Sequence, residues 1–124
     1  MIKRESQTNS NESLKVLISS KGKYDHMIIL YQKIDFFKAE GSYTKIFLED
    51  GNEILISKSL ASIERKLNSL NFIRCHNSYL INIRKVTFFN SKKKILKINN
   101  STIPISRRKY HSTIQIINIL VNQI

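Results

Sequence analysis

Short runs of apolar residues, separated by turn-forming residues, occupy most of the chain and predict β-strands. Ile is the most frequent apolar residue, and β-branched side chains of this kind favour extended backbone. Two apolar runs, 46–48 and 54–56, are continuous, which indicates strands that are covered on both faces. The expected strands are residues 15–19, 24–31, 34–40, 44–49, 53–57, 72–75, 79–82, 85–90, 95–99 and 102–105.

The apolar pattern changes period between residues 60 and 70 and predicts a helix there. Ser57 or Ser59 can accept a hydrogen bond from the first turn as the N-cap. We expect this short helix to cover one face of a sheet. Its apolar side chains fall on one helical face and are Leu60, Ile63, Leu67 and Leu70.

The C-terminal segment after Ser106 fits two patterns. Apolar residues at every third or fourth position from Tyr110 to Val121 form a helical stripe. Ile114 and Ile116, however, flank a polar residue as they would in a strand. We interpret the segment as a helix, because the stripe covers three turns and Ser106 is a suitable N-cap.

Turn signals join the predicted strands into hairpins. Asp50-Gly51 suits a two-residue hairpin turn, and the segments 20–23 and 91–94 are further turns. Pro104 cannot donate to a sheet ladder, so its strand should lie at an edge or end there. The whole pattern predicts a mainly β fold with one short central helix and a C-terminal helix.

A chain of 124 residues is long enough for one domain with its own core. Residues 1–13 are rich in Ser, Asn and Gln and are expected to form a flexible tail, which leaves 14–124 for the folded domain. No apolar run approaches the ~18 residues that span a bilayer, and the first residues do not resemble a signal peptide. We therefore expect a cytoplasmic protein with no membrane partner.

Charge changes the picture, because Lys and Arg total 21 against 9 acidic residues and the net charge is +12. Such a field attracts polyanions, so nucleic acid is the leading candidate partner and an anionic membrane surface is the second. A basic protein without such a partner is the plain alternative. Lys92-Lys93-Lys94 is most simply a solvated hairpin tip that can add to phosphate affinity.

Catalytic and metal chemistry find little support in the sequence. The acidic residues are scattered, and His26, His76, His111 and Cys75 have no metal-ligand spacing. We therefore expect neither an enzyme nor a metal or other cofactor. A single cysteine excludes an intrachain disulfide and fits a reducing compartment, and a packing role is favoured over redox sensing.

The segment Ser106-Arg107-Arg108-Lys109 breaks a local rule. If a helix starts there, three cations lie in its first turn, where the helix dipole favours anions. A bound phosphate would resolve the conflict by meeting the free N–H groups, the Ser106 hydroxyl and the guanidinium groups. The fork of an Arg side chain also matches guanine O6 and N7 in the major groove. We favour such a contact over a merely solvated basic turn.

A second polar segment, residues 74–82, lies between apolar anchors. Asn77 has the geometry to pair with adenine, and the Ser78 hydroxyl can bond a phosphate oxygen. Arg84 adds a charge just beyond the segment. His76 fits a DNA contact and a hydrogen-bonded structural histidine equally well.

Two further positions carry weaker signals. Asn82 fits a turn residue better than a DNA contact. The corner at 41–45 is a polar loop between two expected strands, and it carries Tyr43 and Lys45. An exposed loop tip of this kind can enter a groove of DNA.

These motifs resemble the LytTR-type DNA-binding domain of bacterial transcriptional regulators. The similarity runs from Ile34 to about Leu120, which is most of the chain. The combination of its last two blocks is the specific part. The similar blocks are residues 34–43, Asp50-Gly51, the helix at 60–67, FIRCHNSYLIN at 72–82 and IPISRR at 103–108.

The resemblance implies stacked small antiparallel sheets, with loops rather than a recognition helix in the DNA grooves. It implies base contacts by Tyr43, Asn77 and Arg108. Many family members carry Arg at the position of Asn77, which leaves the base preferred at that contact open. With the charges and hydroxyls noted above, the expected backbone or supporting residues are Lys45, Arg74, His76, Ser78, Arg84, Ser106, Arg107 and Lys109.

The resulting hypothesis is a regulator of transcription that binds double-stranded DNA at direct repeats, with two copies on the DNA. RNA polymerase and a separate receiver protein are further candidate partners. Most members of the family carry an N-terminal receiver domain that this sequence lacks, so a free-standing regulator and an excised effector domain both stay open. A general RNA-binding or ribosome-associated module is the alternative, and a protein-interaction module is a third.

Overall fold

The structure, a computed structural model, describes residues 16–67 and 71–121. The predicted tail at 1–13 and Leu70, at the end of the predicted central helix, lie outside the described residues. The chain divides into two compact units, Met1–Ile34 and Asp35–Ile124. The second unit holds every residue that the sequence marks as a DNA contact.

The first unit contains a two-stranded antiparallel hairpin of β2 (Val16–Lys21) and β3 (Asp25–Leu30), followed by the 3-10 turn η2 (Tyr31–Lys33). The register runs from Val16 opposite Leu30 to Lys21 opposite Asp25. The turn therefore covers residues 22–24 and begins two residues later than the predicted turn at 20–23. Gly22 has a φ of 91°, a conformation that L side chains rarely adopt, and this local preference decides where the strand ends.

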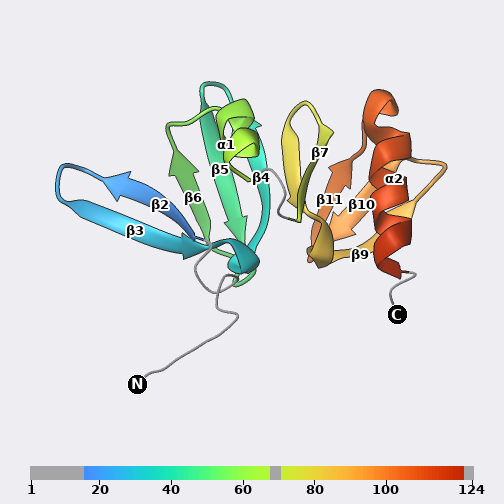
Figure 1. Ribbon diagram of the computed structural model, residues 1–124, viewed down its shortest axis with the longest axis horizontal. Coiled ribbons are helices and arrows are strands. Elements are labelled where there is room, and N and C mark those ends of the chain that lie inside the picture. Colours follow the sequence, from blue (N-terminus) through green and yellow to red (C-terminus); the bar gives the residue numbers. More distant parts are fainter. Residues whose placement is uncertain (1–15, 68–70, 122–124) are drawn as a thin grey trace, which may run out of the picture. The chain divides into compact units, whose positions relative to one another are not determined.

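The second unit is built on a five-stranded sheet with the order β6-β5-β4-β8-β7 (Figure 1). Neighbouring strands β4 and β8, β5 and β6, and β7 and β8 pair antiparallel. The hairpin turn lies at Asp50-Gly51 as predicted, with Gly51 at a φ of 93°, but it is longer than the predicted two residues. The Leu48 N–H donates to the Asn52 carbonyl, and the Gly51 N–H donates to the Leu48 carbonyl. The strands are β4 (Ile34–Glu40), β5 (Tyr43–Leu48), β6 (Glu53–Ile56), β7 (Phe72–His76) and β8 (Tyr79–Asn82).

The central helix α1 (Leu60–Lys66) packs against β7 and β8, as the sequence predicts for a helix that covers the sheet. Ser59, rather than Ser57, is its N-cap, and the Ser59 hydroxyl accepts a hydrogen bond from the Ser62 N–H at 3.1 Å. The predicted apolar face is buried at Leu60, Ile63 and Leu67. Burial of this face rather than helix propensity stabilises so short a helix.

A second, three-stranded antiparallel sheet has the order β11-β10-β9 and carries the C-terminal helix. Its core joins buried Leu96, Ile98 and Ile103 from the sheet to Ile117 from the helix. Pro104 ends β11, which is an edge strand, as its missing N–H requires. These elements are η3 (Ile83–Lys85), β9 (Val86–Asn90), β10 (Ile95–Ile98), β11 (Ser101–Pro104) and α2 (Arg107–Val121).

Two outcomes concern the ambiguous apolar patterns. The C-terminal segment is a helix, as interpreted, because its helical stripe delivers Ile117 to the core. The expectation that the run 54–56 is covered on both faces is wrong. Ile54 and Ile56 are buried, but Leu55 is 56% exposed, because β6 is an edge strand and alternate side chains point to opposite faces.

Candidate nucleic-acid interface

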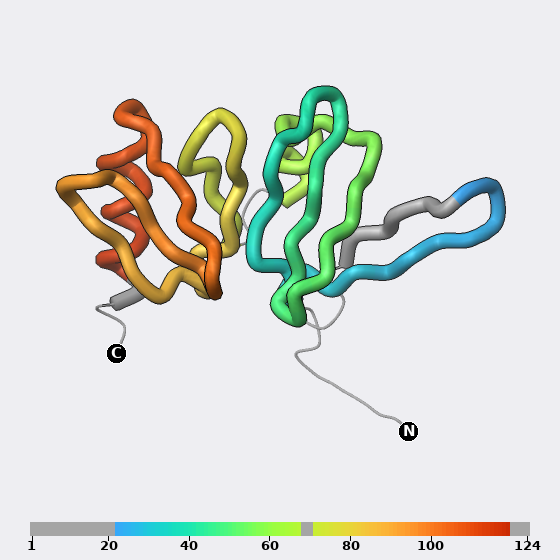
Figure 2. Tube along the Cα trace, turned by 180° about the vertical axis from the view of Figure 1, so that it is seen from behind, coloured from blue at the N-terminus to red at the C-terminus, as the bar shows by residue number. Residues whose placement is uncertain are grey.

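Three chain segments that the sequence marks as DNA contacts lie at one end of the second unit. They are the turn between β4 and β5, the turn between β7 and β8, and the beginning of α2. All three lie at the top of Figure 1, and they stay together at the top when the molecule is seen from behind in Figure 2. Segments far apart in sequence therefore share one edge of the fold.

Backbone hydrogen bonds tie these three segments to one another. The Ala39 N–H at the end of β4 donates to the Ser78 carbonyl at 2.9 Å. The Ser106 N–H, just before α2, donates to the Cys75 carbonyl at 2.9 Å. The register of β7 on β8 shifts between Arg74 and His76, and the Cys75 carbonyl at this irregularity is the one that meets Ser106. The turn of β7 and β8 thus stands between the other two segments.

The turn at 91–94 extends this edge, which the sequence did not predict. The Ile105 N–H donates to the Lys94 carbonyl at 2.9 Å, so the turn lies beside the chain that enters α2. The Lys94 ammonium lies 5.1 Å from the centre of the Tyr110 ring on α2, while Lys92 and Lys93 are exposed. The sequence could have predicted this position from the hairpin of 95–98 and 101–104, because their pairing brings residue 94 next to residue 105.

The loop predicted at 41–45 is shorter in the structure. Only Gly41 and Ser42 form the turn, and β5 already begins at Tyr43. Thr44 is fully buried, and its hydroxyl donates to the Lys58 carbonyl at 2.7 Å. This contact fixes the beginning of β5. Tyr43 is 48% exposed at this edge. Lys45, two residues further on the same face, lies 3.5 Å from the Glu53 carboxylate.

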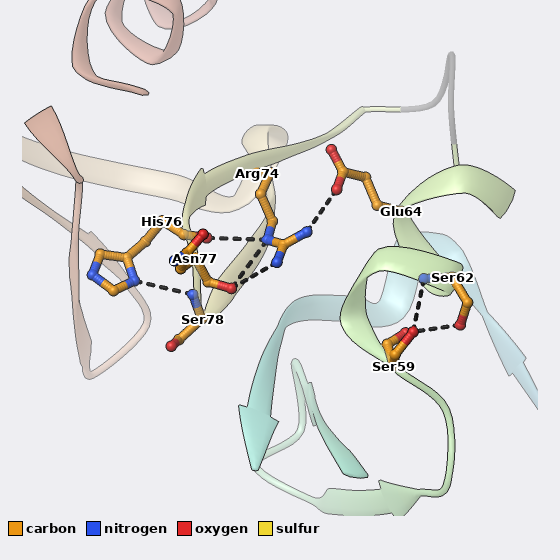
Figure 3. A network of polar contacts seen from close by, with 7 residues as sticks. All are labelled: Ser59, Ser62, Glu64, Arg74, His76, Asn77 and Ser78. Atoms are coloured by element: carbon orange, nitrogen blue, oxygen red, sulfur yellow. Dashed lines mark hydrogen bonds and ion pairs between the residues drawn. The ribbon is translucent and has the colours of Figure 1, made fainter. Parts of the chain in front are cut away.

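The turn between β7 and β8 exposes Asn77, and hydrogen bonds from neighbouring residues stabilise this turn (Figure 3). His76 Nδ1 accepts a hydrogen bond from the Ser78 N–H at 3.0 Å, which fits the structural reading of this histidine. Arg74 donates to the His76 and Asn77 carbonyls. Asn82 is buried, and its side chain accepts from the Arg84 N–H, as a turn residue would.

The first turn of α2 has the predicted cap and the predicted uncompensated cations. The Ser106 hydroxyl accepts from the Lys109 N–H at 3.3 Å. Arg107 and Arg108 are exposed, and the first turn contains no acidic residue. Two carboxylates of other elements are paired with other cations, Glu40 on β4 with Lys38 at 3.7 Å and Glu64 on α1 with Arg74 at 2.7 Å. The start of α2 is therefore positive both from side chains and from the helix dipole.

Arg84 is not brought to this edge. It lies in η3, which follows the end of β8 that is remote from the turn at Asn77. The Ile83 N–H bonds to the Asn71 carbonyl at 2.7 Å, at the start of β7, so η3 belongs to the other end of the hairpin. Figures 1 and 2 show the same separation.

Two buried groups near the strands have raised pKa values. Burial raises the pKa of the Cys75 thiol to about 12, which keeps the thiol protonated at neutral pH and fits the packing role. Burial also raises the pKa of Asp35, against the opposing effects of a hydrogen bond from Asn99 and the charge of Lys85. The Asp35–Asn99 bond joins β4 to the turn between β10 and β11.

Within residues 16–67 and 71–121, no helix has the length and apolar character needed to cross a membrane. The same residues contain no group of three or more His, Cys, Asp or Glu side chains that could hold a metal ion.

Comparison with known proteins shows the family of the chain. The family model of the LytTr DNA-binding domain matches residues 25–118. This chain belongs to the LytTR family of DNA-binding domains. The sensory transduction protein LytT of Oceanobacillus iheyensis is 34% identical to it over 87 residues, or 65% of the chain. The matched part of this chain spans only 35% of the length of LytT.

A solved LytTR structure has the same fold. It is the LytTr DNA-binding domain of a protein described as a methyl-accepting/DNA response regulator from Bacillus cereus. The match covers 83% of this chain and 95% of that domain, with a TM-score of 0.67 at 20% sequence identity. The mainly β architecture predicted from the sequence, with small antiparallel sheets and two helices, is thereby confirmed.

Proposed function

We propose that this LytTR domain binds double-stranded DNA sequence-specifically with the edge that carries Tyr43, Asn77 and Arg108. The observation that supports the proposal is the pair of backbone hydrogen bonds, from Ala39 to Ser78 and from Ser106 to Cys75. They hold three exposed polar segments in a row, and a row of fixed donors can follow the surface of a duplex. Affinity then comes from phosphate contacts, and specificity comes from base edges.

The base-reading roles follow from side-chain chemistry. The Asn77 side chain is exposed at the tip of its turn, and an amide can bond adenine N6 and N7 together. Arg108 is exposed in the first turn of α2, and a guanidinium can bond guanine O6 and N7. Tyr43 offers a half-exposed ring and a hydroxyl at the third position of the row.

Contacts to the phosphate backbone of the DNA come from the groups beside these three residues. The start of α2 offers free N–H groups, the Ser106 hydroxyl, and the charges of Arg107 and Lys109 to one phosphate region. The Ser78 hydroxyl and Lys45 contribute near the other two turns. His76 supports the reading turn through its bond to Ser78 rather than through DNA.

In the cell, such binding regulates transcription. We propose that the domain acts at promoter sites with direct repeats and that two copies occupy one site, since one row reads only a short stretch of duplex. RNA polymerase or a separate receiver protein would be the next partner in the regulatory chain. The DNA-binding domain in this proposal spans residues 14–124.

Selection of bound sequences from a random duplex pool tests the proposal. We expect enrichment of a short motif present twice in direct orientation, measured by sequencing the retained fraction. A structured RNA added as competitor should displace the selected duplex poorly. An unenriched pool, or RNA that competes as well as the selected duplex, would overturn sequence-specific DNA recognition in favour of the RNA-binding alternative.

A further inference from the structure

Arg74 lies on β7 close to the proposed reading edge, yet its guanidinium is turned into the protein (Figure 3). Its Nη1 lies 2.7 Å from the Glu64 carboxylate on α1. Its Nε donates to the His76 carbonyl at 3.1 Å, and its Nη2 donates to the Asn77 carbonyl at 2.7 Å. Only 18% of the Arg74 side chain is exposed.

These contacts hold the one turn that presents Asn77. Asn77 lies between β7 and β8, outside both strands, so its carbonyl is not part of the regular ladder. Both Nε and Nη2 of Arg74 reach that carbonyl, at 3.2 and 2.7 Å. A planar guanidinium holds donors on three nitrogens in a fixed fork and can bond two carbonyls and a carboxylate at once. The three donors of a Lys ammonium share one nitrogen, so they cannot span the same acceptors in this arrangement.

We propose that Arg74 is a positioning residue for base recognition, that it fixes the turn of Asn77, and that Glu64 on α1 holds its guanidinium in place. This inference deepens the proposed function and rests on it. A side chain that reads a base edge must be correctly oriented before binding, because ordering the turn on the DNA would cost affinity. Helix α1 thereby takes part in DNA recognition without touching DNA.

The competing role for Arg74 is a direct phosphate contact. That role would require the guanidinium to leave Glu64 and both turn carbonyls and to swing out to solvent. It would also predict that Glu64 hinders binding, because the carboxylate competes with phosphate for the same charge. The two roles therefore predict opposite effects for removal of the Glu64 charge.

Two variants separate the roles, Arg74→Lys and Glu64→Gln, with affinity measured on a selected duplex and on a random duplex. For Arg74→Lys we expect about tenfold weaker binding to the selected duplex, the scale of one lost base contact. Binding to random duplex and its dependence on salt should change little, because the charge remains. Glu64→Gln should also weaken the selected duplex, and it should leave binding to random duplex unchanged or slightly stronger.

Arg84→Lys is the matched control, because Arg84 is an exposed arginine at the remote end of the hairpin. It should leave both affinities at the wild-type level. A readout without DNA adds a second arm, since ¹⁵N relaxation reports the mobility of the Asn77 amide in the free protein. We expect the Asn77 amide to be more mobile in Glu64→Gln than in wild type. In Arg84→Lys its mobility should equal that of wild type.

The positioning role is overturned if Glu64→Gln strengthens both duplexes and leaves Asn77 as rigid as in wild type. It is equally overturned if Arg74→Lys matches wild type on the selected duplex. Failure of the proposed function looks different, since the wild-type domain itself would then show no preference between selected and random duplex. The Glu64 side chain is 44% exposed to solvent, so Glu64→Gln should fold. This variant therefore tests the positioning role even if Arg74→Lys does not fold.

Discussion

Arg108 and Lys92 are both exposed cations near the same edge, but they stand in different surroundings. Arg108 is held in the first turn of α2, whose start is bonded to β7 through Ser106 and Cys75. Lys92 lies on the turn at 91–94, where its N–H bonds the Asn90 side chain. A fixed guanidinium can discriminate bases, whereas a flexible ammonium contributes charge only.

Arg108→Ala should therefore weaken binding to a selected duplex more than binding to random duplex. We expect a loss of about 1–3 kcal/mol of discrimination, the range for a bidentate base contact. Lys92→Ala should weaken both duplexes slightly and by the same factor. Fluorescence anisotropy titrations on the two duplexes measure both effects, and equal losses for Arg108→Ala would refute its base-reading role.

Asp35 carries a second prediction at the residue scale. Burial raises its pKa, so the folded protein holds this proton more tightly than the unfolded chain does. Stability from this group is therefore fully present below its ordinary pKa of 3.8 and is lost as pH rises through the raised value. Asp35→Asn keeps an acceptor for Asn99 and removes this titration.

The measurement is urea unfolding of wild type and Asp35→Asn across the acidic range. The free energy of unfolding of wild type, minus that of the variant, should fall as the pH rises above the ordinary carboxyl pKa, because the pKa of Asp35 is shifted upward. Other carboxyls cancel in this difference. A difference that grows with pH would mean that Asp35 is stabilised as an anion in the fold.

At the scale of elements, α2 combines good packing with poor local electrostatics. Its stripe reaches the core through Ile117, and Thr113 is fully buried on the same helix. Its first turn nevertheless starts with cations and has no acidic residue. Tertiary burial outweighs an unfavourable dipole interaction of about 0.3–1 kcal/mol per charge, so the helix forms and its positive end stays available to phosphate.

Arg107→Glu should stabilise the free domain and weaken its DNA binding. At low ionic strength the free energy of unfolding should rise by roughly 0.3–1 kcal/mol, because an anion suits a helix N-terminus. Both selected and random duplex should bind more weakly, since a phosphate contact carries no sequence information. Chemical denaturation gives the first quantity and filter binding the second, and a destabilised variant would contradict the argument.

At the scale of the whole molecule, the net charge of +12 makes binding an ion-exchange process. Counterions released from the duplex favour association at low salt, whatever the base sequence. Specificity must then come from the arrangement of a few groups within one unit, where three segments meet at one edge. Net charge and local geometry thus control different properties of the same complex.

The salt dependence follows from this division. If about six phosphates are neutralised, affinity should fall about a thousandfold between 50 and 200 mM salt. Arg107→Glu should flatten the slope of log affinity against log salt, whereas Arg74→Lys should leave it unchanged. Titrations at four or five salt concentrations give these slopes, and a wild-type affinity that hardly changes with salt would exclude a phosphate-dominated interface.

The sequence alone determined the elements, because strand runs, Gly turns and helical stripes are local signals. It predicted a helix at 60–70, where the structure has α1 (Leu60–Lys66), and it predicted that the strand of Pro104 lies at an edge or ends there. It also led to the LytTR family through two short blocks. It overestimated the loop at 41–45 and the burial of Leu55. Those depend on which strand lies at an edge and where a ladder begins, which neighbours distant in sequence decide.

Only the tertiary structure decided which candidate residues meet. Hydrogen bonds from Ala39 to Ser78 and from Ser106 to Cys75 join residues that are 39 and 31 positions apart in the chain, and no local pattern encodes such pairs. The same packing sent Arg84 to the far end of the hairpin and turned Arg74 toward Glu64. The sequence determines the chemistry of each side chain, but the surrounding backbone determines where that side chain points.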